Sequence, residues 1–266
     1  MTDHMVMTLG VRGSVPVSGA DFARYGGSTL CLLVRLAGQF ILIDAGTGML
    51  NLPQETLEET RLPLLLSHPH LDHLLGLTMN PFVFQKGKWL DIYAKRRLEP
   101  LEDTLDRLYS PPLWPVKVSG LVADVSFRDL PERLDLGPVH VDVMEGVHPG
   151  GVSLYRLSGG GRRVTVVTDC TLTPELWPKV EDFARESDLL LIDGQYSEEE
   201  WPSRATFGHN TWRMAAQLGQ GCGAKRVVIL HHAPERTDTA LDEAERDAQS
   251  VCPRCAFARE GEMIEL

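Results

Sequence analysis

The chain has 266 residues, of which 43% are apolar and 24% are charged, close to the proportions of an average globular protein. Its 26 Lys and Arg stand against 37 Asp and Glu, which gives a formal net charge of −11. These numbers exclude collagen-like, disordered and disulfide-scaffold proteins, and no apolar run approaches the roughly 18 to 20 residues that cross a bilayer. An acidic chain without a basic stripe is not expected to bind long nucleic acid. Residues 1–4 carry no basic region followed by an apolar stretch, so we expect a cytoplasmic protein without a secretory signal and without a membrane partner.

Short β-rich runs alternate with helical segments along the chain. Residues 31–36 and 39–43 flank Ala37-Gly38, which predicts a hairpin. Further strands are predicted at 62–66, 139–147, 154–157, 164–167, 189–192 and 227–230, and helices at 98–109, 174–186 and 211–218.

The segment 80–115 is rich in proline and aromatic residues. We predict that residues 1–266 form a single domain and that this segment is a lid-like insertion in it. Its aromatic side chains either wall a pocket in which a ring stacks or pack into the core. They are Phe82, Phe84, Trp89, Tyr93, Tyr109 and Trp114.

Four of the predicted strands run into a residue that can bind a metal ion. In layered α/β folds the ends of strands are where sites are built, so these residues are expected to meet at one edge of the sheets. They are His68, His148, Asp169 and His231.

The segment 67–73 reads SHPHLDH and is the strongest local signal in the sequence. Its histidines and its aspartate, His68, His70, Asp72 and His73, can converge on metal ions from a single loop. Imidazole and carboxylate ligands suit Zn, Mn or Fe, and the motif contains no thiolate. A polar loop with surface histidines is the alternative, and the density of ligand-type residues favours the metal site.

An H-x-H-x-D-H motif after an apolar strand resembles that of the metallo-β-lactamase fold superfamily. The segments GVRGSVP at 10–16 and RYGGST at 24–29 resemble the branch that contains ribonuclease Z and small cyclic phosphodiesterases. The segment DAGTG at 44–48 resembles the D-x-G strand end of the superfamily. The resemblance covers most of the chain and implies an α/β fold, a four-layer αββα sandwich with a metal site at one edge. Dimers are common in this branch, which suggests a homodimer by analogy, but the sequence itself leaves the oligomeric state open.

Carried over by position, the resemblance implies a site with two divalent metal ions, with Zn expected first and Mn or Fe as alternatives. Asp72 would also help to orient the water that acts as the nucleophile. The implied ligands are His68, His70 and His148 for the first ion, Asp72, His73 and His231 for the second, and Asp169 as the bridge between them.

His209 lies in FGHNT at 207–211, which resembles the H-S-T-like segment of the phosphodiesterase branch. The resemblance implies that it protonates the leaving alkoxide or hydrogen-bonds the transition state, whereas the alternative is a histidine that only caps a helix. Asn210 departs from the more usual serine, and we expect little consequence. His232 is expected beside the ligands rather than among them. Asp44 either orients a ligating imidazole or is merely structural, and the role of Asp193 stays open.

The metal ligands indicate hydrolysis of an ester, amide or phosphodiester. Only twenty residues separate His148 from Asp169, which leaves no room for the tRNA-binding arm of the long ribonuclease Z form. We therefore expect a phosphodiesterase whose partner is a small, cyclic phosphodiester. The alternatives are a lactonase or thioesterase of the same fold, and a non-hydrolytic metal-binding protein of cofactor biosynthesis. Cys252 and Cys255 are expected to be ordinary thiols rather than half of a zinc site.

Overall fold

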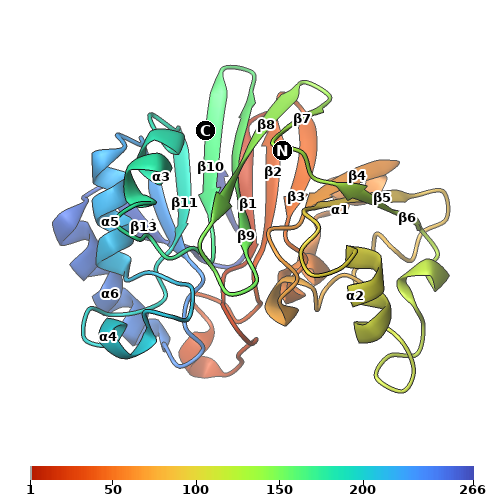
Figure 1. Ribbon diagram of the computed structural model, residues 1–266, viewed down its shortest axis with the longest axis horizontal. Coiled ribbons are helices and arrows are strands. Elements are labelled where there is room, and N and C mark those ends of the chain that lie inside the picture. Colours follow the sequence, from red (N-terminus) through yellow and green to blue (C-terminus); the bar gives the residue numbers. More distant parts are fainter. Residues whose placement is uncertain (1) are drawn as a thin grey trace.

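The computed structural model describes residues 2–266, and this part of the chain forms two seven-stranded sheets packed face to face (Figure 1). In spatial order, the first sheet contains β14 (Glu262–Glu265), β1 (Met5–Gly10), β2 (Cys31–Leu36), β3 (Gln39–Ile43), β4 (Arg61–Leu65), β5 (Trp89–Ala94) and β6 (Asp124–Asp129). The second contains β13 (Cys255–Phe257), β12 (Val227–Leu230), β11 (Leu189–Asp193), β10 (Arg162–Val167), β9 (Val152–Gly159), β8 (Val139–Gly146) and β7 (Arg133–Leu136).

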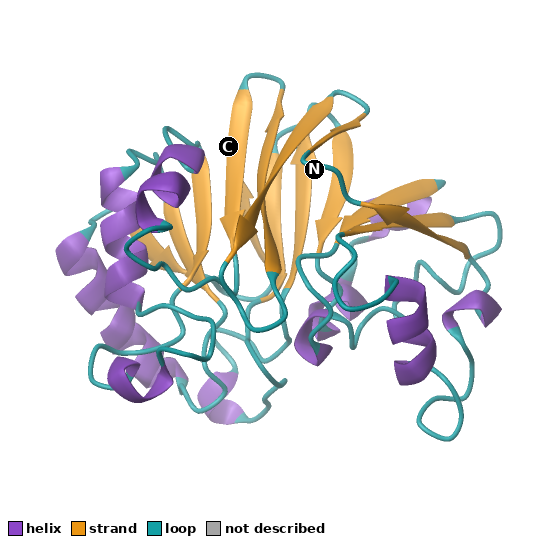
Figure 2. Ribbon diagram, viewed as in Figure 1, coloured by secondary structure: helices purple, strands orange, loops and turns teal. Residues whose placement is uncertain are grey.

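Each sheet joins an antiparallel half to a parallel half. In the first sheet β14, β1, β2 and β3 pair antiparallel, and β3 to β6 pair parallel. In the second sheet β7 to β10 pair antiparallel, and β10 to β13 pair parallel. Parallel strands present their carboxyl ends at one edge of a sheet, so the loops after them are collected there. Figure 2 shows these loops below the two sheets.

The core has three layers of apolar side chains because both faces of both sheets are covered. Alternate residues of one strand point to opposite faces, as in β11, where Leu191 packs between the sheets and Leu190 packs against helices. Helices α3 (Trp177–Phe183), α5 (Trp212–Gly221) and α6 (Asp238–Val251) cover the second sheet, and α2 (Leu101–Leu108) covers the first. The two remaining α-helices of the described residues are α1 (Gln54–Glu58) and α4 (Trp201–Arg204).

The predicted αββα sandwich is confirmed, and so are most of the predicted elements. β2, β3 and β12 have the expected bounds, and the Ala37-Gly38 hairpin joins β2 to β3. Thr211 caps α5, where its side chain accepts a hydrogen bond from the backbone N–H of Met214. None of the helices in residues 2–266 combines the length and the apolar character needed to cross a bilayer.

The lid interpretation of residues 80–115 is wrong for one part of that segment. Residues 89–94 form β5, an inner strand hydrogen-bonded to β4 and β6, because this apolar run completes the sheet instead of covering it. Phe82 and Tyr109 are buried in the core on the outer face of the first sheet, and Trp114 packs against it. For these three aromatic residues, packing into the core is therefore the correct alternative. The assignment of residues 1–266 to a single domain stays a prediction.

Candidate metal centre

Loops after four strands bring the predicted ligands together between the two sheets. The loop after β4 carries the SHPHLDH motif, and its short 3-10 turn, Leu71–His73, buries Asp72 and His73. The remaining ligands follow the second sheet's strands β8, β10 and β12. The structure therefore assembles every residue that the sequence predicted as a metal ligand, in two groups.

The first group, the histidine group, consists of His68, His70 and His148. Nε2 of His148 lies 3.1 Å from Nδ1 of His70, and the ring of His68 lies within 4.6 Å of both rings. Nδ1 of His148 lies 3.1 Å from the carbonyl of Gly208, which turns Nε2 toward the group. Gly208 has a φ of 97°, and a Cβ there would lie 2.0 Å from that Nδ1, so only glycine permits this contact.

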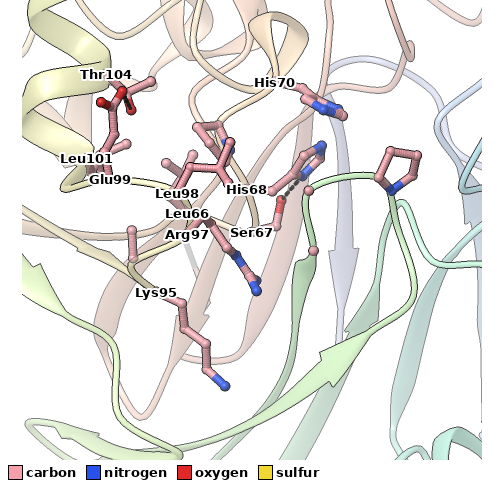
Figure 3. Close-up of a pocket in the computed structure, with 15 residues that line it drawn as sticks. Leu66, Ser67, His68, His70, Lys95, Arg97, Leu98, Glu99, Leu101 and Thr104 are labelled. Carbon is pink, nitrogen blue, oxygen red and sulfur yellow. Dashed lines mark hydrogen bonds between the residues drawn. The ribbon is translucent and has the colours of Figure 1, made fainter.

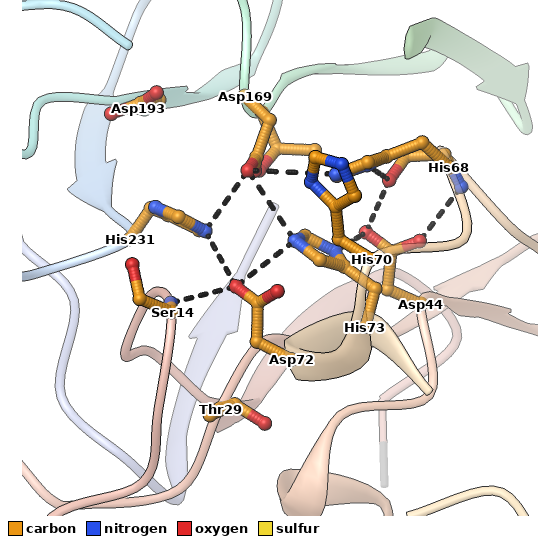
Figure 4. A network of polar contacts seen from close by, with 12 residues as sticks. Ser14, Thr29, Asp44, His68, His70, Asp72, His73, Asp169, Asp193 and His231 are labelled. Atoms are coloured by element: carbon orange, nitrogen blue, oxygen red, sulfur yellow. Dashed lines mark hydrogen bonds and ion pairs between the residues drawn. The ribbon is translucent and has the colours of Figure 1, made fainter. Parts of the chain in front are cut away.

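The second group, the carboxylate group, consists of Asp72, His73, Asp169 and His231, all of which are buried (Figure 4). Nε2 of His73 lies 3.4 Å from one oxygen of each carboxylate. Nε2 of His231 lies 3.2 Å from Asp72 Oδ2 and 3.1 Å from Asp169 Oδ2. The same Asp169 oxygen is 3.8 Å from Nε2 of His68, so Asp169 stands between the two groups.

Hydrogen bonds from outside fix the orientation of several of these side chains. Asp44 Oδ2 accepts a hydrogen bond from Nδ1 of His73 at 2.8 Å, and the two Asp44 oxygens also accept from the backbone and the hydroxyl of Ser67. This leaves Nε2 of His73 as the ring nitrogen that faces the group. Ser14 donates its backbone N–H to Asp72 Oδ2 at 2.7 Å. Of the two readings for Asp44, this geometry is that of a residue that orients an imidazole.

Three site residues have left-handed backbone conformations. φ is 60° at Asp44, 50° at Asp169 and 65° at His231, and each residue lies just beyond a strand. Non-glycine residues seldom adopt this region because the Cβ crowds the backbone. Such strained conformations cluster at functional sites, and here Asp169 and His231 belong to the carboxylate group while Asp44 accepts a hydrogen bond from His73.

The two groups differ in electrostatic character, because one consists of neutral imidazoles and the other of paired opposite charges. Burial lowers the pKa of His68 and lowers that of His148 to about 4, so the histidine group is neutral at pH 7. Burial acts in the same direction on His231, but Asp169 and Asp72 outweigh it and raise the pKa to about 10. Burial likewise opposes ionisation of Asp169, and the charges of His231 and His73 hold its pKa well below the usual value. Protonated imidazoles thus balance two buried carboxylates.

The donor set fits divalent metal ions. Nε2 of His68 and Nε2 of His73 are buried and have no hydrogen-bond partner, which is costly unless an ion occupies their lone pairs. The positive charge that protons supply in the carboxylate group can be supplied by a cation. Imidazole nitrogens and carboxylate oxygens suit Zn, Mn or Fe, and no cysteine of the described chain belongs to either group.

His209 lies beside both groups. Its ring is held by Asp193, a residue whose role the sequence left open. Its Nδ1 is 2.7 Å from Asp193 Oδ2, and its ring stacks on that of His231 with centroids 4.8 Å apart. Asp193 is the last residue of β11, so it follows the same strand-end rule as Asp169 and was recognisable by that rule. Asn210 is buried and bonds to the backbone of Cys170 and Leu172, which ties the loop of His209 to the loop after β10.

His232 is next to a predicted ligand but faces elsewhere. Its Nε2 lies 2.9 Å from the carbonyl of Ala258, and its ring stacks on Phe257 with centroids 5.3 Å apart. Burial lowers the pKa of His232 to about 3. The structure therefore places His231 in the carboxylate group and His232 in the core.

Comparison with known proteins identifies the family. The beta-lactamase superfamily domain matches residues 39–232, well over half of the chain, and the chain belongs to this superfamily of metallo-β-lactamase fold hydrolases. Ribonuclease Z of Lactiplantibacillus plantarum is 22% identical over 90% of this chain and 92% of its own.

Solved structures resemble the chain over nearly its whole length. The metallo-β-lactamase fold protein YhfI from Bacillus subtilis matches with a TM-score of 0.76 at 18% identity, covering all of both chains. A diphosphatase from the PhnP family matches with a TM-score of 0.71 at 17% identity, covering 98% of this chain and 97% of its own. At these identities the structural likeness concerns the fold.

Proposed function

We propose that the protein is a dinuclear metal-dependent phosphodiesterase that acts on small phosphodiesters, cyclic ones among them. The observation that carries the proposal is the placement of His209 and its partner Asp193 next to two adjoining groups of metal-binding side chains. A phosphodiester needs its charge neutralised, a water activated and a leaving alkoxide protonated, and this arrangement offers residues for each task. The names of the relatives, ribonuclease Z and a diphosphatase of the PhnP family, agree with phosphorus–oxygen chemistry.

Two divalent cations, with zinc expected first, would polarise the phosphate and lower the pKa of the attacking water. The histidine group and the carboxylate group would hold one ion each, and Asp169 would contact both. Asp72 would accept a hydrogen bond from the water and orient it for attack. Asp193 accepts the Nδ1 proton of His209, so Nε2 of that ring is the atom that delivers a proton to the leaving oxygen.

Small substrates are favoured by what lies between His148 and Asp169. Strands β9 and β10 fill this interval and are joined by a tight turn, so no arm extends from it to hold a tRNA. The net charge of −11 gives long nucleic acid no general attraction. Around the phosphate itself, two divalent cations would exceed the charge of Asp72 and Asp169.

An assay panel tests the proposal. Protein loaded with Zn or Mn is offered bis-p-nitrophenyl phosphate, cyclic nucleotides, an acyl-lactone and a thioester, and we expect it to hydrolyse the phosphodiesters. His209→Ala should lower phosphodiester turnover by about a hundredfold or more with metal content unchanged, because only proton delivery is lost. Lactone or thioester cleavage that does not depend on His209 would contradict the proposal, and so would a metal-loaded protein inert to the whole panel.

A further inference from the structure

A cavity of about 240 Å³ opens directly beside the histidine group (Figure 3). One wall is the loop that carries His68 and His70, and the opposite wall is the segment from Ala94 to Thr104, which runs from the last residue of β5 into the first turn of α2. The turn at 149–151, just after His148, closes the third side. We call this space the Arg97 cavity. Because His68 and His70 line it, the Arg97 cavity offers room for one substituent of a phosphate held at the proposed metal centre.

The lining of the Arg97 cavity is mostly apolar, with two cations at one end. Leu66, Pro69 and Leu101 contribute hydrocarbon surface. Lys95 and Arg97 are the basic residues of the wall, and Figure 3 shows them on the same side of the space. The cavity is smaller than the roughly 300 to 1,000 Å³ of a drug-sized pocket, so it fits one ring-sized group.

The two cations of the Arg97 cavity share a single carboxylate. Glu145 forms an ion pair with Nη1 of Arg97 and lies 3.4 Å from Nζ of Lys95. Glu145 does not itself line the cavity, and the acidic residue that does, Glu99, is paired with Arg107. The side chain of Glu145 is 46% exposed and that of Arg97 only 15%, so the arginine is the inner member of the pair. Positive charge therefore exceeds negative charge here, although the protein as a whole is acidic.

Arg97 has a fixed position relative to His68. Its Nη2 donates to Ser153 Oγ at 3.2 Å, the backbone N–H of Ser153 donates to the carbonyl of Ser67, and Ser67 Oγ lies 3.0 Å from Nδ1 of His68. Gly151 packs directly on the guanidinium, since a Cβ there would lie 2.5 Å from Nη1. A guanidinium held in place binds carboxylates and phosphates in a defined geometry.

We propose that the Arg97 cavity selects phosphodiesters in which one substituent is a compact, mostly apolar group that carries its own oxyanion, a carboxylate or a phosphate. Arg97 binds this second anion with help from Lys95, while the apolar wall holds the body of the substituent. The inference rests on the proposed function, because it assumes that the scissile phosphate lies at the metal centre. Arg97 and Lys95 are specificity-determining residues in this scheme and take no part in the bond cleavage.

Two synthetic esters of equal shape test the inference. One is 4-carboxyphenyl 4-nitrophenyl phosphate, and the other carries a carboxamide in place of the carboxylate. We expect the metal-loaded protein to favour the carboxylate ester in kcat/KM by about tenfold, the size of one hydrogen bond to a charged group. Arg97→Met should abolish this preference and leave the carboxamide ester unaffected. Glu145→Gln should increase the preference, because it frees both cations, and a loss of folding cannot produce that result.

Arg96→Met is the matched control, since Arg96 neighbours Arg97 in the chain, is exposed and does not line the cavity. It should keep the wild-type preference. Calorimetric binding of 4-carboxyphenyl phosphate and of its carboxamide analogue should give the same ranking without turnover. If both esters are hydrolysed equally well, or if Arg97→Met keeps the preference, the inference is refuted and the proposed function stands. If neither ester is hydrolysed, the proposed function is wrong and the inference falls with it.

Discussion

The histidine group and the carboxylate group lie side by side but differ in charge and exposure. The histidine group contains no carboxylate of its own, and His70 reaches the surface beside the Arg97 cavity. The carboxylate group is buried throughout and holds Asp72 and Asp169. In a buried site a cation gains most where negative charge is already present. We therefore expect the carboxylate group to bind its ion more tightly, and the histidine group to hold the ion that exchanges and faces the substrate.

The largest expected effect comes from removing the residue that the two groups share. Asp169→Ala should lose both ions and lower activity by about a thousandfold or more, because the activated water depends on the ions. His68→Ala should lose activity as well, with loss of the ion of the histidine group. Metal analysis by mass spectrometry checks both variants. Two bound ions per chain in either variant would contradict the bridging role of Asp169 and the ligand role of His68.

Metal binding should release protons from one group and not from the other. At pH 7, His231, with its pKa raised to about 10, is protonated in the metal-free chain and must lose its proton to bind an ion. His148, with its pKa lowered to about 4, is already neutral. Calorimetric titrations with Zn in buffers of different ionisation enthalpy measure the protons released.

The matched variants for this titration each keep one group. His68→Ala retains the carboxylate group and should release protons, and its Zn affinity should fall as the pH is lowered from 8 to 6. His231→Ala retains the histidine group, so it should release almost none. Equal proton release from the two variants would contradict the claim that only the carboxylate group holds protons that an ion must displace.

Asp44→Asn should weaken the carboxylate group most, because Asp44 contacts His73 directly and reaches His68 only through Ser67. The amide cannot accept the Nδ1 proton of His73 as well as a carboxylate does, and loss of such an orienting partner typically costs 10- to 100-fold in metal affinity. Competition with a fluorescent zinc chelator measures the effect. Asp135→Asn, the same change at an exposed position, should leave both affinities unchanged. A loss confined to the histidine group would show that Asp44 acts by another route.

The smallest effect on the centre is expected from His232→Ala. This variant should keep both ions, because the ring faces Ala258 and Phe257 and not the ligands. It should lower the free energy of unfolding by about 1 to 3 kcal/mol through lost packing. Chemical denaturation and metal analysis together check the two parts. If His232→Ala lost as much metal as a His231 variant does, the assignment of His231, and not His232, to the carboxylate group would be unsafe.

The first sheet's share of the site was predictable from the sequence because it is local. His68, His70, Asp72 and His73 come from one loop, and their spacing is itself a signal. The second sheet supplies its residues singly, from the ends of β8, β10, β11 and β12. There the strand-end pattern and the family resemblance identified His148, Asp169 and His231. Neither of these two signals singled out Asp193. The importance of Asp193 depends on its contact with His209, which belongs to another element of the fold.

The sequence did not predict several elements, because their local signals are weak or because they form strands only through long-range pairing. Helix α6 buries Leu241, Ala244 and Ala248 on one face. Its other positions are mostly polar and alanine is only weakly apolar, so the helical periodicity of apolar residues is faint in the sequence. Its cap, Thr237, accepts from the backbone N–H of Ala240 and was a usable signal. Strands β13 and β14 are only three and four residues long, and they exist as strands through pairing with partners distant in sequence.

The pairing of β14 with β1 brings the two ends of the described chain together. Leu266 donates its backbone N–H to the carbonyl of His4 at 3.2 Å, and Figure 1 shows both ends away from the loops that carry the ligands. A short linker between these ends, with new termini opened at the exposed Leu113, would give a circular permutant with the same packing. In that chain Asp169 and His231 would precede His68 in sequence. The order of ligands along the polypeptide, by which such centres are recognised, is thus separable from the geometry that makes them work.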